Sequence, residues 1–337
     1  MDTFHLLPYD PSWDEKWDRF VMEGSTNGTF LQTRRFLSYH PSGRFEDASL
    51  MALDGQELVA VCPAAAQAVD GVRMLRSHPG STFGGLVIAP ALLRAPRLVA
   101  LVSQLDAFWR EQGFGAAELK LTSDLFSTHP TDALQYALYH AGYTDELEIA
   151  AYVPVAGRTH EELVAAYSFN KRYDLKKCVK AGLSDRPLHT REELAAFYEL
   201  LCQNLKKFDA TPVHTLAELV DFHDARLRDE ARFLGVFTPE GEMVAGACLF
   251  WFSQARVLHT QYLATAPLKG CVPSTYLYDS VVREGLALGA RCVSFGTSTH
   301  DRGRVLNTGL IQNKAPPTIT TLIFFPFLLF VIFNFSL

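Results

Sequence analysis

The stretch ARFLGVFTPEGEMVAGACLFWF, residues 231–252, decides the fold. Two apolar runs rich in Phe, Val and Leu flank a polar turn that contains Gly241, and this pattern predicts an antiparallel β-hairpin. The stretch ASLMALDGQELVAV, residues 48–61, repeats it around Asp54-Gly55, a strong short-range hairpin signal. LVA at 58–60 and MVA at 243–245 occupy equivalent positions in the two hairpins. The chain therefore contains two similar hairpins.

The elements that follow each hairpin also match. After the first hairpin we expect a strand, a helix and a strand at 72–77, 97–112 and 117–121. After the second we expect the same order at 256–263, 274–288 and 292–295, and a glycine ends each helix. The recurrence, at an offset of about 175 to 185 residues, indicates duplication of one α/β unit. The alternative is chance similarity between two ordinary α/β segments.

Length and composition are those of a globular protein of about two domains, with 337 residues, 48% hydrophobic and 20% charged. Global disorder, collagen and coiled coil are excluded. The formal net charge of -6 leaves no overall positive field. We therefore expect no binding to DNA, and any contact with nucleic acid must come from a local patch.

Familiar motifs of catalysis, metal binding and secretion are missing from the sequence. It has no GxSxG elbow, Walker loop, HExxH or GxGxxG motif, and the 11 histidines are scattered, so we assign no metal. The six cysteines are never closer than 21 residues, which predicts reduced, mostly buried thiols. The amino-terminal residues carry acids and two tryptophans instead of a signal peptide. We expect a cytoplasmic protein.

A basic helix is predicted between the two copies. Thr159 and Glu162 form a capping box, and Gly182 ends the helix. Its second half contains five basic residues: Lys171, Arg172, Lys176, Lys177 and Lys180. Two readings are open, a solvated face and a patch that binds phosphate or an RNA backbone. Two further helices are expected at 191–207 and 216–232.

Two loops of the second copy are candidate ligand sites. TQYLATAPLKGCVPS, residues 260–274, leads through Lys269 and Gly270 into a helix that starts near Ser274, an arrangement that suits a pyrophosphate. It can also be an ordinary helix start. The loop after the last strand is rich in polar residues: Thr297, Ser298, Thr299, Asp301, Arg302, Arg304 and Asn307. It is either a ligand loop or a solvated connection.

These segments together resemble the FemAB-like branch of the GNAT acyltransferase superfamily. The resemblance rests on FNKRYDLKKCVKAGL, EGEMVAGACLFW, VLHTQYLAT and above all SFGTSTHDRGRVLNTGLI, and it covers about residues 25 to 314. It implies an α/β (α+β) fold of two tandem GNAT-like domains, each a mixed twisted sheet flanked by helices. We expect the first domain at 1–155 and the second, incomplete one at 156–314.

The resemblance also implies a reaction. An acyl or aminoacyl group passes to an amine of a small molecule or cell-envelope precursor. Acyl-CoA or aminoacyl-tRNA is the co-substrate, so tRNA is a candidate partner and no cofactor is tightly bound. The alternative is a non-catalytic GNAT-like module that binds an anionic ligand.

Site roles follow from the resemblance residue by residue. Lys269 and Gly270 fall at the pyrophosphate loop, although the fuller Gln/Arg-x-x-Gly-x-Gly/Ala pattern is absent. Backbone N-H groups near Tyr262 to Ala264 would polarise the donor carbonyl, and Ser274 would help to bind the donor. Asp301, His300 or Tyr276 would deprotonate the amine. The residues expected to bind substrate are Asn170, Arg172, Lys176, Thr297, Ser298, Arg304 and Asn307.

The carboxyl-terminal residues 315–337 differ from the rest of the chain. No charged residue follows Lys314, and six of the 24 phenylalanines lie between Phe324 and Phe335. The family normally continues here with a Gly-rich turn and more of the fold. We expect either a membrane anchor, which would make the protein membrane-associated, or an aberrant segment outside the functional fold.

Overall fold

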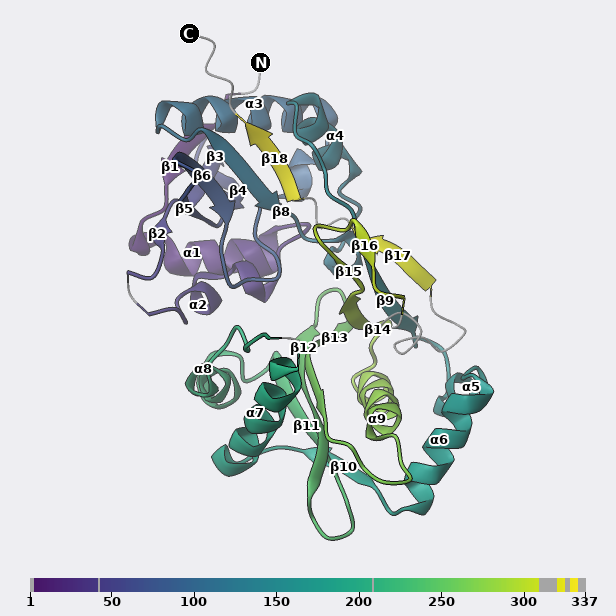
Figure 1. Cartoon of the computed structure of the whole chain (residues 1–337). Helices are drawn as coiled ribbons and strands as arrows, with labels where there is room; N and C mark the ends of the chain where they lie inside the picture. The colour runs from purple at the N-terminus through teal and green to yellow at the C-terminus, as the bar shows by residue number, and fades with distance from the viewer. Residues whose placement is uncertain (1–2, 42, 208, 309–319, 325–327, 333–337) are drawn as a thin grey trace. The chain divides into compact units, whose positions relative to one another are not determined.

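The computed structural model describes residues 3–41, 43–207, 209–308, 320–324 and 328–332. The chain divides into two compact units (Figure 1). Unit 1 comprises Met1–Glu148 and Phe324–Leu337, and unit 2 comprises Ile149–Ile323. The boundary falls inside a strand, β9 (Glu148–Pro154), whereas the sequence placed it after residue 155. The reason is that β9 belongs to the sheet of unit 2, where it pairs antiparallel with β14 (Cys292–Thr297).

Unit 1 contains the first copy of the duplicated unit. Its elements are β1 (His5–Pro8), α1 (Asp14–Arg19), α2 (Arg34–Leu37), β2 (Glu46–Asp47), β3 (Leu50–Asp54), β4 (Glu57–Cys62), β5 (Ala64–Val69), β6 (Val72–Ser77), β7 (Val87–Ile88), α3 (Ala95–Glu111), β8 (Ala116–Lys120) and α4 (Asp132–His140). They form the sheets β1-β3-β4-β7 and β18-β8-β6-β5-β2. The predicted hairpin is β3–β4, and Gly55 takes the positive φ of +62° that its turn requires. Strand β6 pairs parallel with β8, and the chain between these two strands contains helix α3.

Unit 2 contains the second copy. Its elements are α5 (His160–Ala165), α6 (Phe169–Lys180), β10 (Ser184–Pro187), α7 (Arg191–Lys206), α8 (Leu216–Asp221), β11 (Ala231–Phe237), β12 (Met243–Phe252), β13 (Val257–Thr265), α9 (Pro273–Ala287), β15 (Thr299–His300) and β16 (Val305–Leu306), together with β9 and β14. The sheet order is β10-β11-β12-β13-β14-β9-β17. Strands β13 and β14 are parallel and joined by α9, as β6 and β8 are by α3. The predicted duplication is confirmed.

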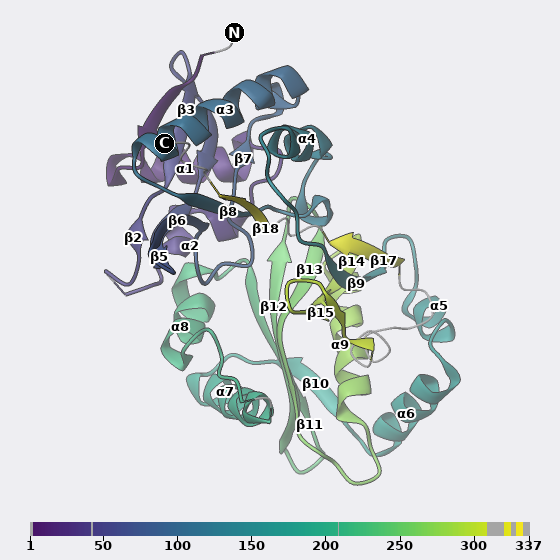
Figure 2. The same cartoon turned by 45° about the horizontal axis from the view of Figure 1, so that its top comes forward.

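Helices cover both faces of the unit 2 sheet. Helices α6 and α9 pack on one face, where Leu277 and Val281 of α9 meet Leu258 and Val293 of the strands. Helices α7 and α8 lie on the other face (Figure 2). There a Cβ on Gly246 would lie 2.6 Å from the Phe197 ring, so the close approach of α7 requires glycine.

Two predicted helices are shorter than expected. The segment from Thr159 to Gly182 forms two helices, α5 and α6, because Ser168 caps α6 by accepting a hydrogen bond from the Lys171 amide. Tyr167, between them, is buried and donates a hydrogen bond to Asp279. The helix expected at 216–232 is α8 followed by a π-helical turn, Phe222–Arg226. Strand β11 already begins at Ala231, inside the range that was expected to be helical.

Two segments of the carboxyl-terminal residues are strands. Strand β17 (Thr320–Phe324) lies beside β9, and β18 (Leu328–Ile332) pairs antiparallel with β8, with Leu328 opposite Lys120. Here the structure differs from the expectation that 315–337 lies outside the fold, because these β-branched and aromatic residues favour strands. The rest of that stretch lies outside the described residues. No helix among the residues that the structure describes is long and apolar enough to cross a membrane.

Candidate functional site

A fork between the parallel strands β13 and β14 is the main feature of unit 2. Their pairing covers only Val257–His259 and Cys292–Ser294, and His259 opposite Ser294 is the final pair. Beyond it β13 continues along β12 to Thr265, while Thr297 of β14 pairs with Ala150 of β9. The two strands therefore part, and beyond His259 no other strand of the described residues pairs with this edge of β13.

Backbone alternation directs one amide into this fork. The Ala266 amide donates to the Val244 carbonyl of β12 at 2.8 Å, so Ala266 faces β12. The Thr265 amide faces the other way and donates to Asn204 Oδ1 at 3.1 Å. Successive residues of a strand alternate in direction. Ala264 therefore faces β12, opposite Gly246, and the Leu263 N-H points into the fork. It is the middle residue of the predicted Tyr262 to Ala264 segment.

A β-bulge reorients β13 just before that amide. Cys248 is opposite Tyr262 and Leu249 is opposite Thr260, so Gln261 has no partner on β12. The Tyr262 hydroxyl lies 2.6 Å from His214 Nδ1, in the segment before α8. Burial is the main cause that raises the pKa of Tyr262 well above its usual value. By the same alternation the Tyr262 backbone faces Cys248 of β12, and its side chain bonds to His214.

His259 lies where β13 and β14 part at the fork, and it was not among the site residues predicted from the sequence. His259 and Ser294 are both buried, and His259 Nδ1 lies 3.1 Å from Ser294 Oγ. A Cβ on Gly296 would lie 3.4 Å from His259 Cε1. Leu258 and Val293 pack against α9, so strand alternation turns His259 and Ser294 to the opposite face.

The predicted donor loop connects the end of β13 to α9. Leu268 and Cys271 form an isolated bridge, and Gly270 takes a φ of +81° between them. Lys269 is exposed and Ser274 is half-buried in the first turn of α9. Helix α9 has Val272 at its N-cap and no side-chain cap. Its amino-terminal N-H groups are thus suited to an anion, the more so with Lys269 close by.

The basic helix lies against this loop. The Cys178 thiol donates to the Val272 carbonyl at 3.5 Å, and the Cys271 thiol lies 4.0 Å from the Lys177 carbonyl. The exposed side chains of Lys176, Lys177 and Lys180 belong to the same helix. The sequence treated the glycine loop and the basic helix as separate candidates. The structure brings them together beside the amino terminus of α9.

Two of the predicted substrate-binding residues on this helix differ in their surroundings. Asn170 is exposed in the first turn of α6. Arg172 Nη1 donates to the Ala165 carbonyl at 2.9 Å and also to the Tyr167 carbonyl. These are carbonyls at the end of α5, which need partners outside their own helix. The Arg172 guanidinium therefore supports the break between α5 and α6.

Lys171 was not assigned a role from the sequence. It lines a small cavity with side chains of α9 and the adjacent strands, among them Tyr278 and Phe295. Its ammonium nitrogen lies 5.7 Å from the Tyr278 ring centroid, and the Tyr278 and Phe295 rings meet edge to face at 5.2 Å. Burial lowers the pKa of Lys171 from 10.5 to about 8. No sequence pattern marked this burial, since Lys176, Lys177 and Lys180 of the same helix are exposed.

Tyr276 lies beside a network of charged side chains centred on the buried Asp279. Asp279 accepts hydrogen bonds from His160 Nε2 at 2.8 Å, the Tyr167 hydroxyl at 3.2 Å and Arg283 Nε at 3.1 Å. Arg283 also donates to Asp185 at 2.7 Å and lies 5.7 Å from the Tyr276 ring. Burial is the main cause that raises the pKa of Tyr276. A tyrosine that holds its proton more tightly is a poor general base.

The polar loop after β14 is a small hairpin, β15–β16. His300 Nε2 lies 2.9 Å from Asn307 Nδ2, and both His300 and Asp301 lie near its turn. Asp301 and Arg302 have positive φ angles of 48° and 54° there, and Arg304 is exposed. Ser298 is buried and its amide donates to the Ile149 carbonyl at 2.6 Å. The predicted bases His300 and Asp301 are thus near each other, and Tyr276 lies apart from them in the network on α9.

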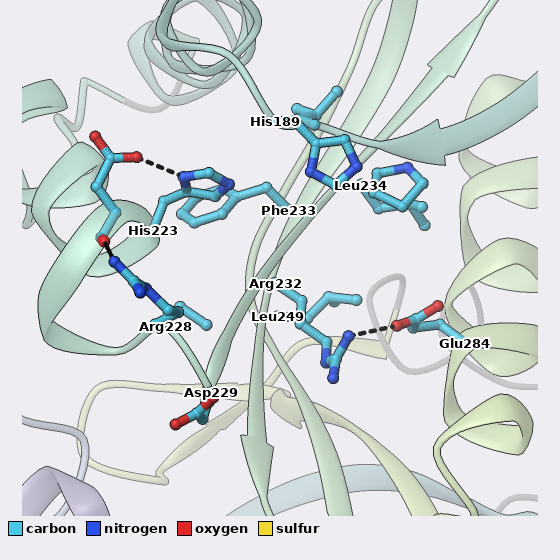
Figure 3. A pocket seen from close by; sticks show the side chains of 13 residues that line it. His189, His223, Arg228, Asp229, Arg232, Phe233, Leu234, Leu249 and Glu284 are labelled. Carbon is cyan, nitrogen blue, oxygen red and sulfur yellow. Dashed lines mark hydrogen bonds and ion pairs between the residues drawn. The ribbon is translucent and has the colours of Figure 1, made fainter.

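A second cavity of about 480 Å³ lies elsewhere in unit 2 (Figure 3). Within its lining Arg232 pairs with Glu284 at 3.4 Å, and His223 pairs with Asp224 at 2.8 Å. The strand register places it at the end of the sheet where β13 begins, away from the fork. It was not predicted from the sequence, and we do not assign the donor to it. Among the described residues no group of three or more His, Cys, Asp or Glu could hold a metal ion.

Comparisons with known proteins identify the fold. No family model matches the chain, and no curated protein matches it. FemX matches with a TM-score of 0.68 and 14% identity, over 97% of this chain and 96% of that one. The tandem GNAT protein from the clavulanic acid biosynthesis pathway matches with a TM-score of 0.56 and 12% identity, over 97% of both chains. L-PGS from Bacillus licheniformis matches at 0.53 and 12%, over 87% of this chain and 77% of that one. The chain therefore has a tandem GNAT fold, similar to the folds of FemX and of the tandem GNAT protein.

Proposed function

We propose that this protein is an N-acyltransferase that moves an acyl or aminoacyl group from acyl-CoA or aminoacyl-tRNA to an amine. The observation that carries the proposal is the fork in unit 2. It supports the proposal because the Leu263 N-H faces an edge of β13 that no strand of the described residues covers, and because β13 leads directly into the loop before α9. The loop and the first turn of α9, at one end of the site, suit an anion. The Leu263 N-H, at the other end, suits a carbonyl oxygen that gains negative charge.

The chemistry follows from these two ends. The donor phosphates would lie against Lys269, Gly270 and the first turn of α9. The donor carbonyl would accept a hydrogen bond from the Leu263 N-H, which stabilises the negative charge that develops on its oxygen. The amine nitrogen attacks the carbonyl carbon, a C-N bond forms, and the thiolate of CoA or the ribose oxygen of tRNA leaves. A base removes the proton from the amine.

The base stays a prediction. His300 and Asp301 are favoured over Tyr276, because their hairpin follows the end of β14 at the fork and because the raised pKa of Tyr276 disfavours proton removal. Acceptors from the cell envelope are expected on the strength of the FemAB-like fold. The exposed lysines of α6 favour a polyanionic donor such as aminoacyl-tRNA.

The test is a transfer assay on the full chain. Acetyl-CoA, longer acyl-CoAs and aminoacyl-tRNA are each incubated with a panel of amines, and amide products are detected by mass spectrometry. Donor binding is measured in parallel by calorimetry. The proposal predicts an amide product from at least one donor class. Donor binding with no product from any amine would favour a binding module, and no donor binding would refute the proposal.

A further inference from the structure

We propose that Cys178 and Cys271 are a redox-sensitive thiol pair that forms a disulfide across the junction between α6 and the donor loop. Each thiol approaches the residue next to the other cysteine. Cys178 Sγ lies 3.5 Å from the carbonyl of Val272, and Cys271 Sγ lies 4.0 Å from the carbonyl of Lys177. Cys271 also lies close enough to Cys178 to contribute, after burial, to the raised pKa of the Cys178 thiol. Two cysteines 93 positions apart in the sequence therefore meet side by side.

The two thiols differ in a way that suits stepwise oxidation. Cys271 is partly exposed, and Cys178 is buried. Burial raises the pKa of the Cys178 thiol, so the more exposed Cys271 is expected to meet an oxidant first. With hydrogen peroxide, the Cys271 sulfur attacks one oxygen, the O-O bond breaks, and sulfenic acid and water form. The Cys178 sulfur then displaces the hydroxyl, which leaves as water, and two thiols and one peroxide yield one disulfide and two waters.

The disulfide would join the carboxyl-terminal half of α6 to the residue after Gly270. Nothing lies within 4 Å of a Cβ position on Gly270, whose φ is +81°, and we expect this uncrowded turn to adapt when a donor binds. A covalent link at its neighbour would restrict that adaptation and hold the loop against the lysines of α6. This consequence rests on the proposed function, whereas formation of the disulfide does not.

The test uses the full reduced chain treated with hydrogen peroxide and then digested without reductant. Mass spectrometry should find one peptide pair joined through Cys178 and Cys271, lighter by two hydrogens than the free peptides, and reductant should release it. Cys271→Ser and Cys178→Ala should each abolish the pair. Cys202→Ser changes the other half-buried cysteine and should leave it unchanged.

Measurements of donor binding distinguish a failure of the thiol-pair proposal from a failure of the proposed acyltransferase function. The donor used is the one that the transfer assay identifies. In the oxidised chain its affinity should change by about fivefold or more, the usual scale for coupled sites, and reduction should restore the original affinity. If Cys271 instead goes on to sulfinic acid, or joins a cysteine other than Cys178, the thiol-pair proposal is wrong. If the disulfide forms and donor affinity does not change, its role at the donor loop is refuted. If the reduced chain binds no donor at all, the proposed function fails while the disulfide stands.

Discussion

The side chain of Asn204 takes both hydrogen-bonding groups of the Thr265 backbone. Asn204 Nδ2 donates to the Thr265 carbonyl at 2.9 Å, and Asn204 Oδ1 accepts from the Thr265 amide at 3.1 Å. An asparagine of α7 therefore stands where a neighbouring strand would otherwise pair. It anchors the end of β13 to α7, while the Leu263 N-H, two residues earlier, is directed into the fork.

Asn204→Ala should therefore loosen the end of β13. We expect the free energy of unfolding to fall by about 1 to 3 kcal/mol, because a strand amide and carbonyl lose their partners. The catalytic rate should fall as well, since the direction of Leu263 depends on that strand. Urea unfolding and a transfer assay measure the two effects. Gln203→Ala, at an exposed neighbour of Asn204, is the control and should change neither.

Lys269→Ala should weaken donor binding by about 1.5 to 3 kcal/mol, the usual contribution of a hydrogen bond to a charged group. Calorimetry with the donor measures this. Lys206→Ala, which removes an exposed lysine on α7, should leave the affinity as it is. An unchanged affinity in Lys269→Ala would place the donor phosphates elsewhere.

Charge reversal of the α6 lysines tests whether the donor is a polyanion. The double variant Lys176→Glu/Lys177→Glu should weaken tRNA binding and lower the slope of log affinity against log salt by about one to two, if each lysine contacts one phosphate. Far-UV circular dichroism should stay the same. A salt dependence equal to that of the unchanged protein would mean that these lysines are only a solvated face.

Arg172→Ala should act on stability more than on substrate. The guanidinium supplies partners to the carbonyls of Ala165 and Tyr167, so we expect a loss of about 1 to 2 kcal/mol of unfolding free energy. Asn170→Ala, at the exposed position nearby, should be nearly neutral for stability. A variant Arg172→Ala with full stability and a raised Michaelis constant for substrate would restore the substrate-binding role expected from the sequence.

Lys171→Met should stabilise the protein at neutral pH. Burial lowers the pKa of Lys171 to about 8, against 10.5 for an ordinary lysine, so the folded state bears the cost of a buried charge below pH 8. Between these two values the folded protein binds fewer protons than the unfolded chain, and its stability rises with pH. The advantage of Lys171→Met over the unchanged protein should therefore shrink as pH rises from about 8 to 10.5. Urea unfolding at pH 7 and pH 9.5 measures it.

The exposed Lys176 offers a matched control on the same helix. Lys176→Met should show no such pH-dependent gain, because its charge remains in water. An equal response of the two variants would show that Lys171 is as well solvated as Lys176, against the burial seen here.

Local patterns were enough to predict the repeated part of the fold. The turn glycines, the alternating apolar runs and the helix with its terminal glycine are properties of short segments, and β3–β4, α3, β8, β11–β12 and α9 appear where such patterns occur. The break between α5 and α6 is only partly a local feature. Ser168, which caps α6, is a local signal, but the burial of Tyr167 against Asp279, a residue of another helix 112 positions away, is not.

The candidate site shows the same contrast between local sequence signals and contacts that form only in the folded protein. Lys269 and Gly270 could be proposed from the sequence because a glycine loop before a helix is a local signal. Asn204 was missed because its partner Thr265 lies 61 positions away, and an asparagine within a helix carries no mark of its tertiary contact. The low pKa of Lys171 likewise follows from packing against α9. Contacts of this kind need the folded structure.

The role of the Leu263 N-H is the central claim, and replacing the amide tests it most directly. Leu263→Pro removes that N-H at an open strand edge, where proline is best tolerated in a sheet. Leu263→Ala shortens the same side chain and keeps the N-H. With the donor class identified, we expect Leu263→Pro to bind the donor with near-normal affinity and to lose about 100- to 1000-fold in catalytic rate, while Leu263→Ala keeps most of its rate. Equal rates in a folded Leu263→Pro and in Leu263→Ala would contradict the account.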